Sequence, residues 1–188
     1  MISSQSTAQQ KPRAEVLVEG ELSPFEHEAL YRTLRKGFRT ENPSYRPIVD
    51  EELSTRVIIT FHHQYSKEIF TDILQEDWRD LKELLKQITY RRGKAGAAFT
   101  LTFNAPPLQI KFNTGVLEQR DLGSALDQIG HLTGIVGQMI RPETLDKPLQ
   151  TIEASYDKQS DRWSRFEALT ATDEKYRFDD AEFRWVRV

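Results

Sequence analysis

The segment from Asp121 to Arg141 constrains the fold most, because it combines a wide apolar face with a band of glycines. Wound at about 100° per residue, its apolar side chains cover roughly half of a helix surface. The glycines fall together along the edge of that apolar half; they are Gly123, Gly130, Gly134 and Gly137. The segment therefore predicts a helix over 122–140 that packs on both its apolar face and its glycine band.

The glycine band has an energetic cost that calls for a structural reason. Each interior glycine costs about 1 kcal/mol relative to alanine, so four cost roughly 4 kcal/mol out of a net stability of about 5–15 kcal/mol. Residues without a Cβ atom let another backbone come close, so we expect a second element of the same chain to pack there. A second subunit is one alternative. The other is that the segment breaks near Thr133–Gly134 and forms no single helix.

Composition favours one globular domain. The chain has 188 residues, of which 38% are hydrophobic and 29% are charged, which is enough for one sizeable core. Residues 1–13 are rich in Ser and Gln and lack the apolar stretch of a signal peptide, so we expect a disordered tail followed by a single domain over 14–188. No apolar run reaches about 18 residues, which predicts no transmembrane helix.

Charge and cysteine content narrow the partners and the compartment. The chain has no cysteine, which excludes disulfides, thiolate metal sites and cysteine nucleophiles, and fits a cytoplasmic protein. The formal net charge of −3 gives no overall attraction to nucleic acid or to anionic membranes.

Two further helices are predicted, over 23–37 and 75–91. Ser23-Pro24-Phe25-Glu26 is a helix start, with a serine cap, proline at the first position and a glutamate that reaches back. We expect the buried stripe of this helix to begin at Phe25 and its end to lie at Gly37. Apolar residues from Leu74 to Ile88 repeat every three or four positions and indicate the second helix. Residues 67–74 fit either a strand or a helix start.

Alternating or continuous apolar residues predict strands over 14–19, 54–63, 97–104 and 108–113. The loop over 40–52, which contains Pro43 and Pro47, separates the first helix from the second of these strands. Two β-hairpins are expected at the C-terminal end, over 151–168 and 175–188. The predicted fold class is α+β: a mainly antiparallel sheet packed against about three helices, near 23–37, 75–91 and 122–140.

The basic stretch Tyr90–Gly96 admits two interpretations. As a functional loop, Arg91, Arg92 and Lys94 would bind an anion, since arginine forks grip phosphate oxygens and glycines free the backbone. It is not a P-loop, because the required Gly-x-x-x-x-Gly-Lys-Ser/Thr pattern is absent and the stretch ends a helix. As a structural feature, the two arginines complement the helix C-terminus, and this interpretation is favoured.

No residue pattern identifies a catalytic centre, a metal site or a cofactor. His62 and His63 are neighbours on a strand, so their side chains point to opposite faces and do not share one ion. His27 and His131 stand alone on helices. No Gly-x-Ser-x-Gly or His-Glu-x-x-His pattern occurs.

Aromatic and basic residues alternate near the C-terminal end, as in proteins that stack single-stranded nucleic acid. The aromatic residues concerned are Trp163, Phe166, Tyr176, Phe178, Phe183 and Trp185. Acidic residues balance the basic ones there, so packing in the core or in an interface is favoured over binding to nucleic acid.

We therefore expect a non-catalytic interaction or scaffolding protein that binds a protein partner or associates with itself. The alternative is a regulatory or ligand-binding domain that takes an anionic ligand, or nucleic acid, at the loop Arg91-Arg92-Gly93-Lys94. A third hypothesis is an enzyme with a dispersed site that uses His62 or His63, because a site assembled only by the fold leaves no sequence motif.

Overall fold

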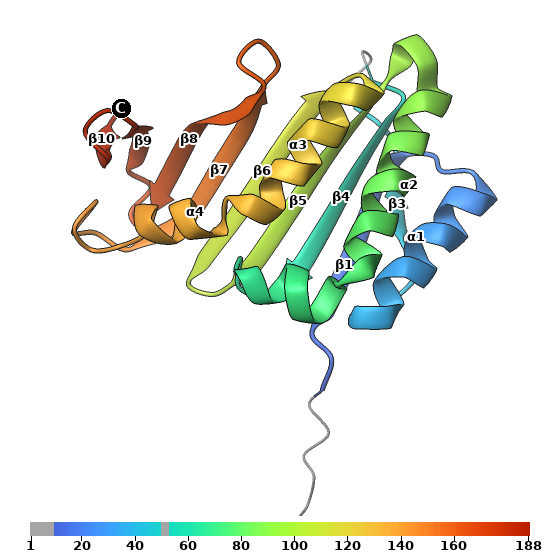
Figure 1. Ribbon diagram of the computed structural model, residues 1–188, viewed down its shortest axis with the longest axis horizontal. Coiled ribbons are helices and arrows are strands. Elements are labelled where there is room, and N and C mark those ends of the chain that lie inside the picture. The colour runs from blue at the N-terminus through green and yellow to red at the C-terminus, as the bar shows by residue number, and fades with distance from the viewer. Residues whose placement is uncertain (1–9, 50–52) are drawn as a thin grey trace, which may run out of the picture.

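One sheet runs through the chain and sets the position of the helices (Figure 1). The computed structural model describes residues 10–49 and 53–188. Its ten strands follow the order β10-β9-β8-β7-β6-β5-β4-β1-β2, and β3 also pairs with β1. The strands are β1 (Arg13–Gly20), β2 (Arg39–Thr40), β3 (Ser44–Arg46), β4 (Thr55–His62), β5 (Ala97–Ala105), β6 (Leu108–Val116), β7 (Leu149–Asp157), β8 (Arg162–Thr170), β9 (Lys175–Asp179) and β10 (Arg184–Arg187).

The helices lie on one side of this sheet, in front of it in Figure 1. They are α1 (Pro24–Gly37), the π-helix η1 (Ile69–Leu74), α2 (Glu76–Arg92), the 3-10 turn η2 (Gly93–Ala95), α3 (Gln119–His131) and α4 (Thr133–Met139). The strand sequences explain this arrangement. In β4, Val57, Ile59 and Phe61 are fully buried, whereas Ile58 and Thr60 between them are half-buried. An alternating strand buries one face under helices and leaves the other to solvent.

The sheet is mixed but mostly antiparallel, and the chain connections explain which pairs are parallel. Short turns join β5 to β6, β7 to β8, β8 to β9 and β9 to β10, and each of these pairs is antiparallel. Helices connect β4 to β5 and β6 to β7, and these pairs are parallel. A parallel pair needs such a crossover. The predicted α+β class and the C-terminal hairpins are confirmed.

Most predicted elements lie where the sequence places them, with the expected local chemistry. The helices predicted over 23–37 and 75–91 correspond to α1 and α2. The stretch 67–74, which fits a strand or a helix, is helical throughout, and its last six residues form η1. The predicted loop over 40–52 contains the short strand β3, and its residues 50–52 lie outside the described residues. Of the tail predicted over 1–13, residues 1–9 also lie outside them, and Arg13 already belongs to β1.

The helix predicted over 122–140 is divided. α3 ends at His131, Leu132 separates the two helices, and α4 begins at Thr133. The sequence interpretation with a break near Thr133–Gly134 describes this better than a continuous helix does. The division lets each helix bury its own apolar residues: α3 buries Leu126 and Ile129, and α4 buries Val136 and Met139.

Two tryptophans fasten the C-terminal strands to these helices. Trp163 Nε1 on β8 donates a hydrogen bond to the Ala125 carbonyl of α3 at 2.8 Å. Trp185 Nε1 on β10 donates to the Met139 carbonyl of α4, also at 2.8 Å. A buried indole N–H needs such a partner, so these bonds position β8 and β10 under the helical layer.

Candidate functional site

The start of α1 is built by a complete capping box. The Glu26 backbone N–H donates to Ser23 Oγ at 3.2 Å, and the Ser23 N–H donates to Glu26 Oε2 at 2.9 Å. Pro24 occupies the first turn, where its missing N–H is harmless. The box turns the Glu26 side chain back toward the helix start, and its carboxylate is fully buried there.

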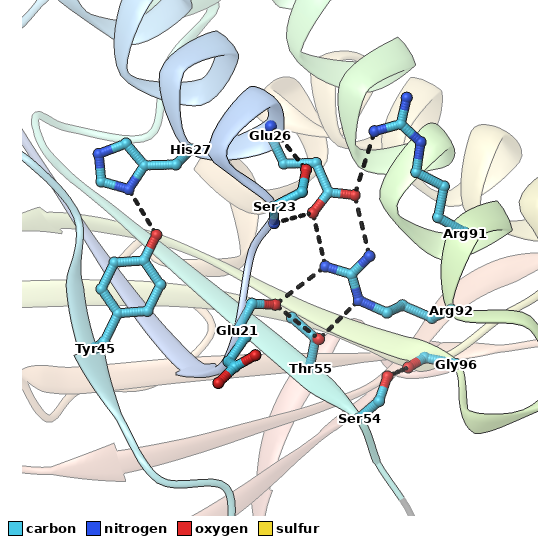
Figure 2. Close-up of polar contacts among 10 residues, drawn as sticks. All are labelled: Glu21, Ser23, Glu26, His27, Tyr45, Ser54, Thr55, Arg91, Arg92 and Gly96. Carbon is cyan, nitrogen blue, oxygen red and sulfur yellow. Dashed lines mark hydrogen bonds and ion pairs between the residues drawn. The ribbon is translucent and has the colours of Figure 1, made fainter.

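The end of α2 supplies the partner of this buried carboxylate (Figure 2). Arg92 Nη1 and Nη2 donate to Glu26 Oε1 and Oε2 at 3.0 and 2.7 Å, which is a bidentate pair. Arg92 Nε donates to Thr55 Oγ1 at 2.9 Å, and Nη2 also donates to the Glu21 carbonyl at 3.0 Å. The Arg92 side chain is only 16% exposed. It therefore ties α1, α2 and β4 together.

The Glu26 carboxyl is held in its charged form. Burial by itself would raise its pKa, but the hydrogen bonds from Arg92 and Ser23 and the charges of Arg92 and Arg91 outweigh burial. The pKa of Glu26 consequently lies below the ordinary value for glutamate. The pair is a charged one at neutral pH.

Arg91, which precedes Arg92 in the chain, faces the surface. Its side chain is 46% exposed, and Nη1 lies 3.6 Å from Glu26 Oε1. Its guanidinium carbon lies 5.4 Å from the centroid of the Phe25 ring, within the range of a cation–π contact. Phe25 is 61% exposed and Tyr90 is 75% exposed. Together with the exposed Lys94, these residues form a surface where α1 begins and α2 ends, called here the junction surface: Phe25, Tyr90, Arg91 and Lys94.

Phe25 corrects one sequence expectation. The helical pattern predicts Phe25 at the start of the buried stripe of α1, but its ring is mostly exposed. The capping box explains the difference, because the N-terminal turn of α1 directs Glu26 inward and leaves the preceding residue outside. An exposed phenylalanine under an arginine is part of the surface rather than of the core.

The basic loop predicted to bind an anion is thus divided by the fold. Arg91 and Lys94 lie at the surface, whereas Arg92 is occupied by Glu26, Thr55 and a backbone carbonyl. Gly93, at φ +54°, ends α2 as expected for a C-terminal glycine. Binding of an anion by the complete set remains a prediction.

A shallow hollow of about 680 Å³ adjoins Arg92. Its lining includes the side chains of Ser23, Ser54 and Thr55, which can donate hydrogen bonds. Ser54 Oγ donates to the Gly96 carbonyl at 2.8 Å and Thr55 Oγ1 to the Glu21 carbonyl at 3.2 Å. The hydroxyl groups of Ser54 and Thr55 therefore already donate within the chain.

The glycine band is divided in a similar way. A Cβ atom at Gly130 would lie 3.6 Å from Trp78 Nε1, and one at Gly123 would lie 3.6 Å from the Lys86 side chain. Both neighbours belong to α2, and 3.6 Å is an ordinary van der Waals separation, so a methyl group would fit at either position. Close approach of a second element along the glycine band therefore stays a prediction.

Gly134 and Gly137, on α4, have a different environment. A Cβ atom at either position would meet no other element of the described chain within 4 Å. Ile135 between them is half exposed. Packing of this part of the band against a second subunit therefore stays a prediction.

The side chains of His62, His63 and His27 each have a different partner. His62 Nε2 lies 2.9 Å from Glu15 Oε2, and this hydrogen bond is the main cause that lowers the pKa of Glu15. His63 Nδ1 lies 2.8 Å from the Gln64 carbonyl oxygen. His27 Nδ1 lies 2.6 Å from Tyr45 Oη (Figure 2). Within residues 10–49 and 53–188, no group of three or more His, Cys, Asp or Glu is arranged to hold a metal ion.

The C-terminal aromatic side chains face the helices and are mostly buried. Trp163, Phe166, Tyr176, Phe178 and Trp185 are each at most 8% exposed. A base cannot stack on a ring that the core already covers. The core interpretation of this stretch fits the structure, and Phe183 is its partly exposed member.

The ion pair at the centre of the junction is not predicted by any motif in the sequence. Glu26 is predicted as part of the capping box and Arg92 as a complement to the helix C-terminus, and both roles are present in the structure. Nothing in the spacing of residues 26 and 92 shows that two antiparallel helices bring them together. A glutamate fixed by a capping box has a second carboxylate oxygen to satisfy, and this is the signal that could have suggested a basic partner.

No family model, curated protein or solved structure matches the chain. Fold and site alone therefore define its class, an α+β domain with helices on one face of an open sheet. No helix in the described part of the chain is long and apolar enough to cross a membrane.

Proposed function

We propose that the chain is a non-catalytic interaction domain of the cytoplasm, and that it binds a protein partner through the junction surface. The observation that carries this proposal is the exposure of Phe25, whose ring Arg91 contacts, and of Tyr90, which precedes Arg91 in the chain. Aromatic residues and arginine are the side chains most enriched at the energetic centres of protein interfaces. An exposed Phe25 ring in contact with the Arg91 guanidinium, and an exposed Tyr90 ring nearby in the chain, are thus better explained by a partner than by stability.

The buried pair beneath the surface supports the same function. Arg92 and Glu26 fix the ends of α1 and α2 relative to each other through two direct hydrogen bonds. Phe25 and Arg91 adjoin these residues in the chain, so they are held in place without a partner. Preorganised contact residues lower the entropic cost of binding.

The test compares two variants of the full chain. The junction variant carries Phe25→Ser, Tyr90→Ser and Arg91→Ser. The control carries Ile135→Ser and Ile140→Ser, which remove exposed apolar side chains from a different surface. Each protein is immobilised and exposed to extract of the source cells, after circular dichroism and urea unfolding have shown that it is folded.

We expect proteins retained by the wild type and the control to be lost from the junction variant. Loss of one anchor residue costs about 2 kcal/mol, which is roughly a 30-fold loss in affinity. Equal retention of the same proteins by the junction variant contradicts the proposal.

A second candidate function is binding of an anionic ligand or nucleic acid at the same loop. The observation that favours it is the hollow of about 680 Å³ beside Arg92, near the exposed Arg91 and Lys94. Inorganic pyrophosphate and a short single-stranded DNA are suitable probes. Binding that weakens with salt and disappears in Arg91→Ala/Lys94→Ala supports this function, because phosphate contacts are electrostatic. Binding unchanged by the two substitutions contradicts it.

A further inference from the structure

The opposite end of the α1–α2 layer carries a second, acidic hollow. Its volume is about 710 Å³, and it lies where α1 ends, η1 passes and α2 begins. α2 has 17 residues and therefore spans about 25 Å, which separates this hollow from the junction surface at the other end of the helix. The lining residues are Gln10, Lys11, Pro12, Lys36, Gly37, His63, Glu68, Asp72, Ile73, Leu74, Gln75, Glu76 and Asp77.

The two ends of the layer carry opposite charge. The hollow has two carboxylates in excess when His63 is counted as neutral, and its Lys36 is already paired with Asp77 at 2.7 Å. The junction surface carries the two exposed cations Arg91 and Lys94, whereas Arg92 and Glu26 beneath it neutralise each other. The hollow and the junction surface are therefore complementary in sign.

The dipole of α2 explains only part of this polarity. Glu76 and Asp77 in its first turn and the arginines in its last turn are each stabilised by the helix ends. Glu68 and Asp72 come before the helix begins and are exposed, and Lys94 comes after it ends. These residues extend the charge of each end beyond what the helix itself requires.

From this complementarity we infer that the partner of the junction surface is a second copy of this chain. The junction of one copy docks into the acidic hollow of the next, head to tail. This inference rests on the proposed function. An unrelated acidic partner would neutralise the junction surface but not the acidic hollow. A contact between two copies pairs the junction surface of one with the hollow of the other, so a single type of contact uses both surfaces. Such a heterologous contact repeats, so the assembly grows with concentration unless a rotation closes it into a ring.

The test reverses the charge of each surface separately. The junction-reversed variant carries Arg91→Glu and Lys94→Glu, and the hollow-reversed variant carries Glu68→Lys and Asp72→Lys. All four side chains are exposed, and urea unfolding checks that both variants fold. Sedimentation velocity then measures the mass of each protein over a range of concentrations at low ionic strength, where exposed charges are least screened.

We expect the wild-type mass to rise with concentration and to fall when salt is added. Each single-surface variant should stay monomeric. An equimolar mixture of the two variants should associate again. The acidic junction of one variant then meets the basic hollow of the other, and the basic junction of the second meets the acidic hollow of the first. The chain that carries all four substitutions should also regain association.

A control of equal charge change, Arg162→Glu with Arg184→Glu on β8 and β10, should associate like the wild type. A monomeric wild type, an unchanged single-surface variant or a mixture that stays monomeric overturns the inference. The proposed function has its own test, the capture experiment, and is contradicted when the junction variant (Phe25→Ser, Tyr90→Ser, Arg91→Ser) retains every protein that the wild type captures. The wild type could also be monomeric and still capture a different protein through Phe25, Tyr90 and Arg91. That result would support the proposed function and overturn only the inference that the partner is a second copy.

Discussion

The basic loop and the glycine band are divided in the same way. In each, one half contacts other elements of the chain (the closed half), and the other half faces the surface (the open half). In the loop, Arg92 is sealed against Glu26, whereas Arg91 lies half exposed over Phe25. In the band, Gly130 faces Trp78 on α2, whereas Gly134 faces no other element of the described chain.

The contrast shows that residues of one type within one motif have different roles. Successive residues of a helix point about 100° apart, so Arg91 and Arg92 at the end of α2 cannot both face inward. Gly130 and Gly134 would share a face on a continuous helix, but the break at Leu132 separates their surroundings. Closed halves should therefore control stability, and open halves should control binding.

The largest expected effect concerns the closed half of the loop. Glu26→Gln should lower the free energy of unfolding by about 3–5 kcal/mol, because the buried guanidinium of Arg92 then loses its counter-charge. Urea unfolding monitored by circular dichroism measures the change.

Arg91→Gln is the matched control on the open half and should change stability by less than about 1 kcal/mol. Equal losses from the two substitutions would show that the loop is not divided.

The next effect concerns the closed half of the glycine band. Gly130→Leu should lower the free energy of unfolding by about 1–3 kcal/mol, because the added side chain overlaps Trp78 and Phe70. Gly137→Leu adds the same side chain where there is space and serves as the control. A stable Gly130→Leu protein would mean that α3 does not depend on close approach to α2.

The pH dependence of stability tests the ion pair without removing the Glu26 side chain, so its effect is smaller than that of Glu26→Gln. The folded-state pKa of Glu26 is lowered, and its stabilisation is therefore fully present above the unfolded-state value of about 4.3 and is lost as the pH falls through the folded-state pKa. The stability difference between wild type and Glu26→Gln should be constant above roughly pH 5 and shrink at lower pH. A difference that does not depend on pH would contradict a charged pair.

The smallest effect is a gain of stability. Gly134→Ala should raise the free energy of unfolding by up to about 1 kcal/mol, since alanine is the better helix former and nothing within 4 Å in the described chain opposes its methyl group. A thermal unfolding scan of the dilute protein is sufficient. A loss would indicate that another element, such as a second subunit, packs against α4.

The fold was predictable wherever the signal is local. The capping box at Ser23 and Glu26 and the alternation of Phe99, Leu101 and Phe103 led directly to α1 and β5. The short strands β2 and β3 were not predictable, because two or three residues carry no periodicity. The break at Leu132 was predictable only as an alternative, near Thr133–Gly134, since the apolar pattern continues across it.

For the candidate site, the sequence predicts which residue types are present but not which of them are buried. Tyr90–Gly96 indicates a basic loop, but the sequence does not indicate which arginine is buried. That choice depends on Glu26 of α1, 66 positions away. The pairing of Arg92 with Glu26 is set by the packing of two helices and not by spacing along the chain. The exposure of Phe25 follows instead from the capping box, which turns Glu26 inward and leaves the preceding residue outside.

Hydrogen exchange at low and high protein concentration tests the central claim most directly, namely that the open half of the loop is the surface that meets a second copy. If a second copy binds there, amides in residues 25–28 and 90–94 should become protected together with those in 67–77 as the concentration rises, while those in 134–139 should not change. Protection confined to 134–139, or no change anywhere, would contradict the claim.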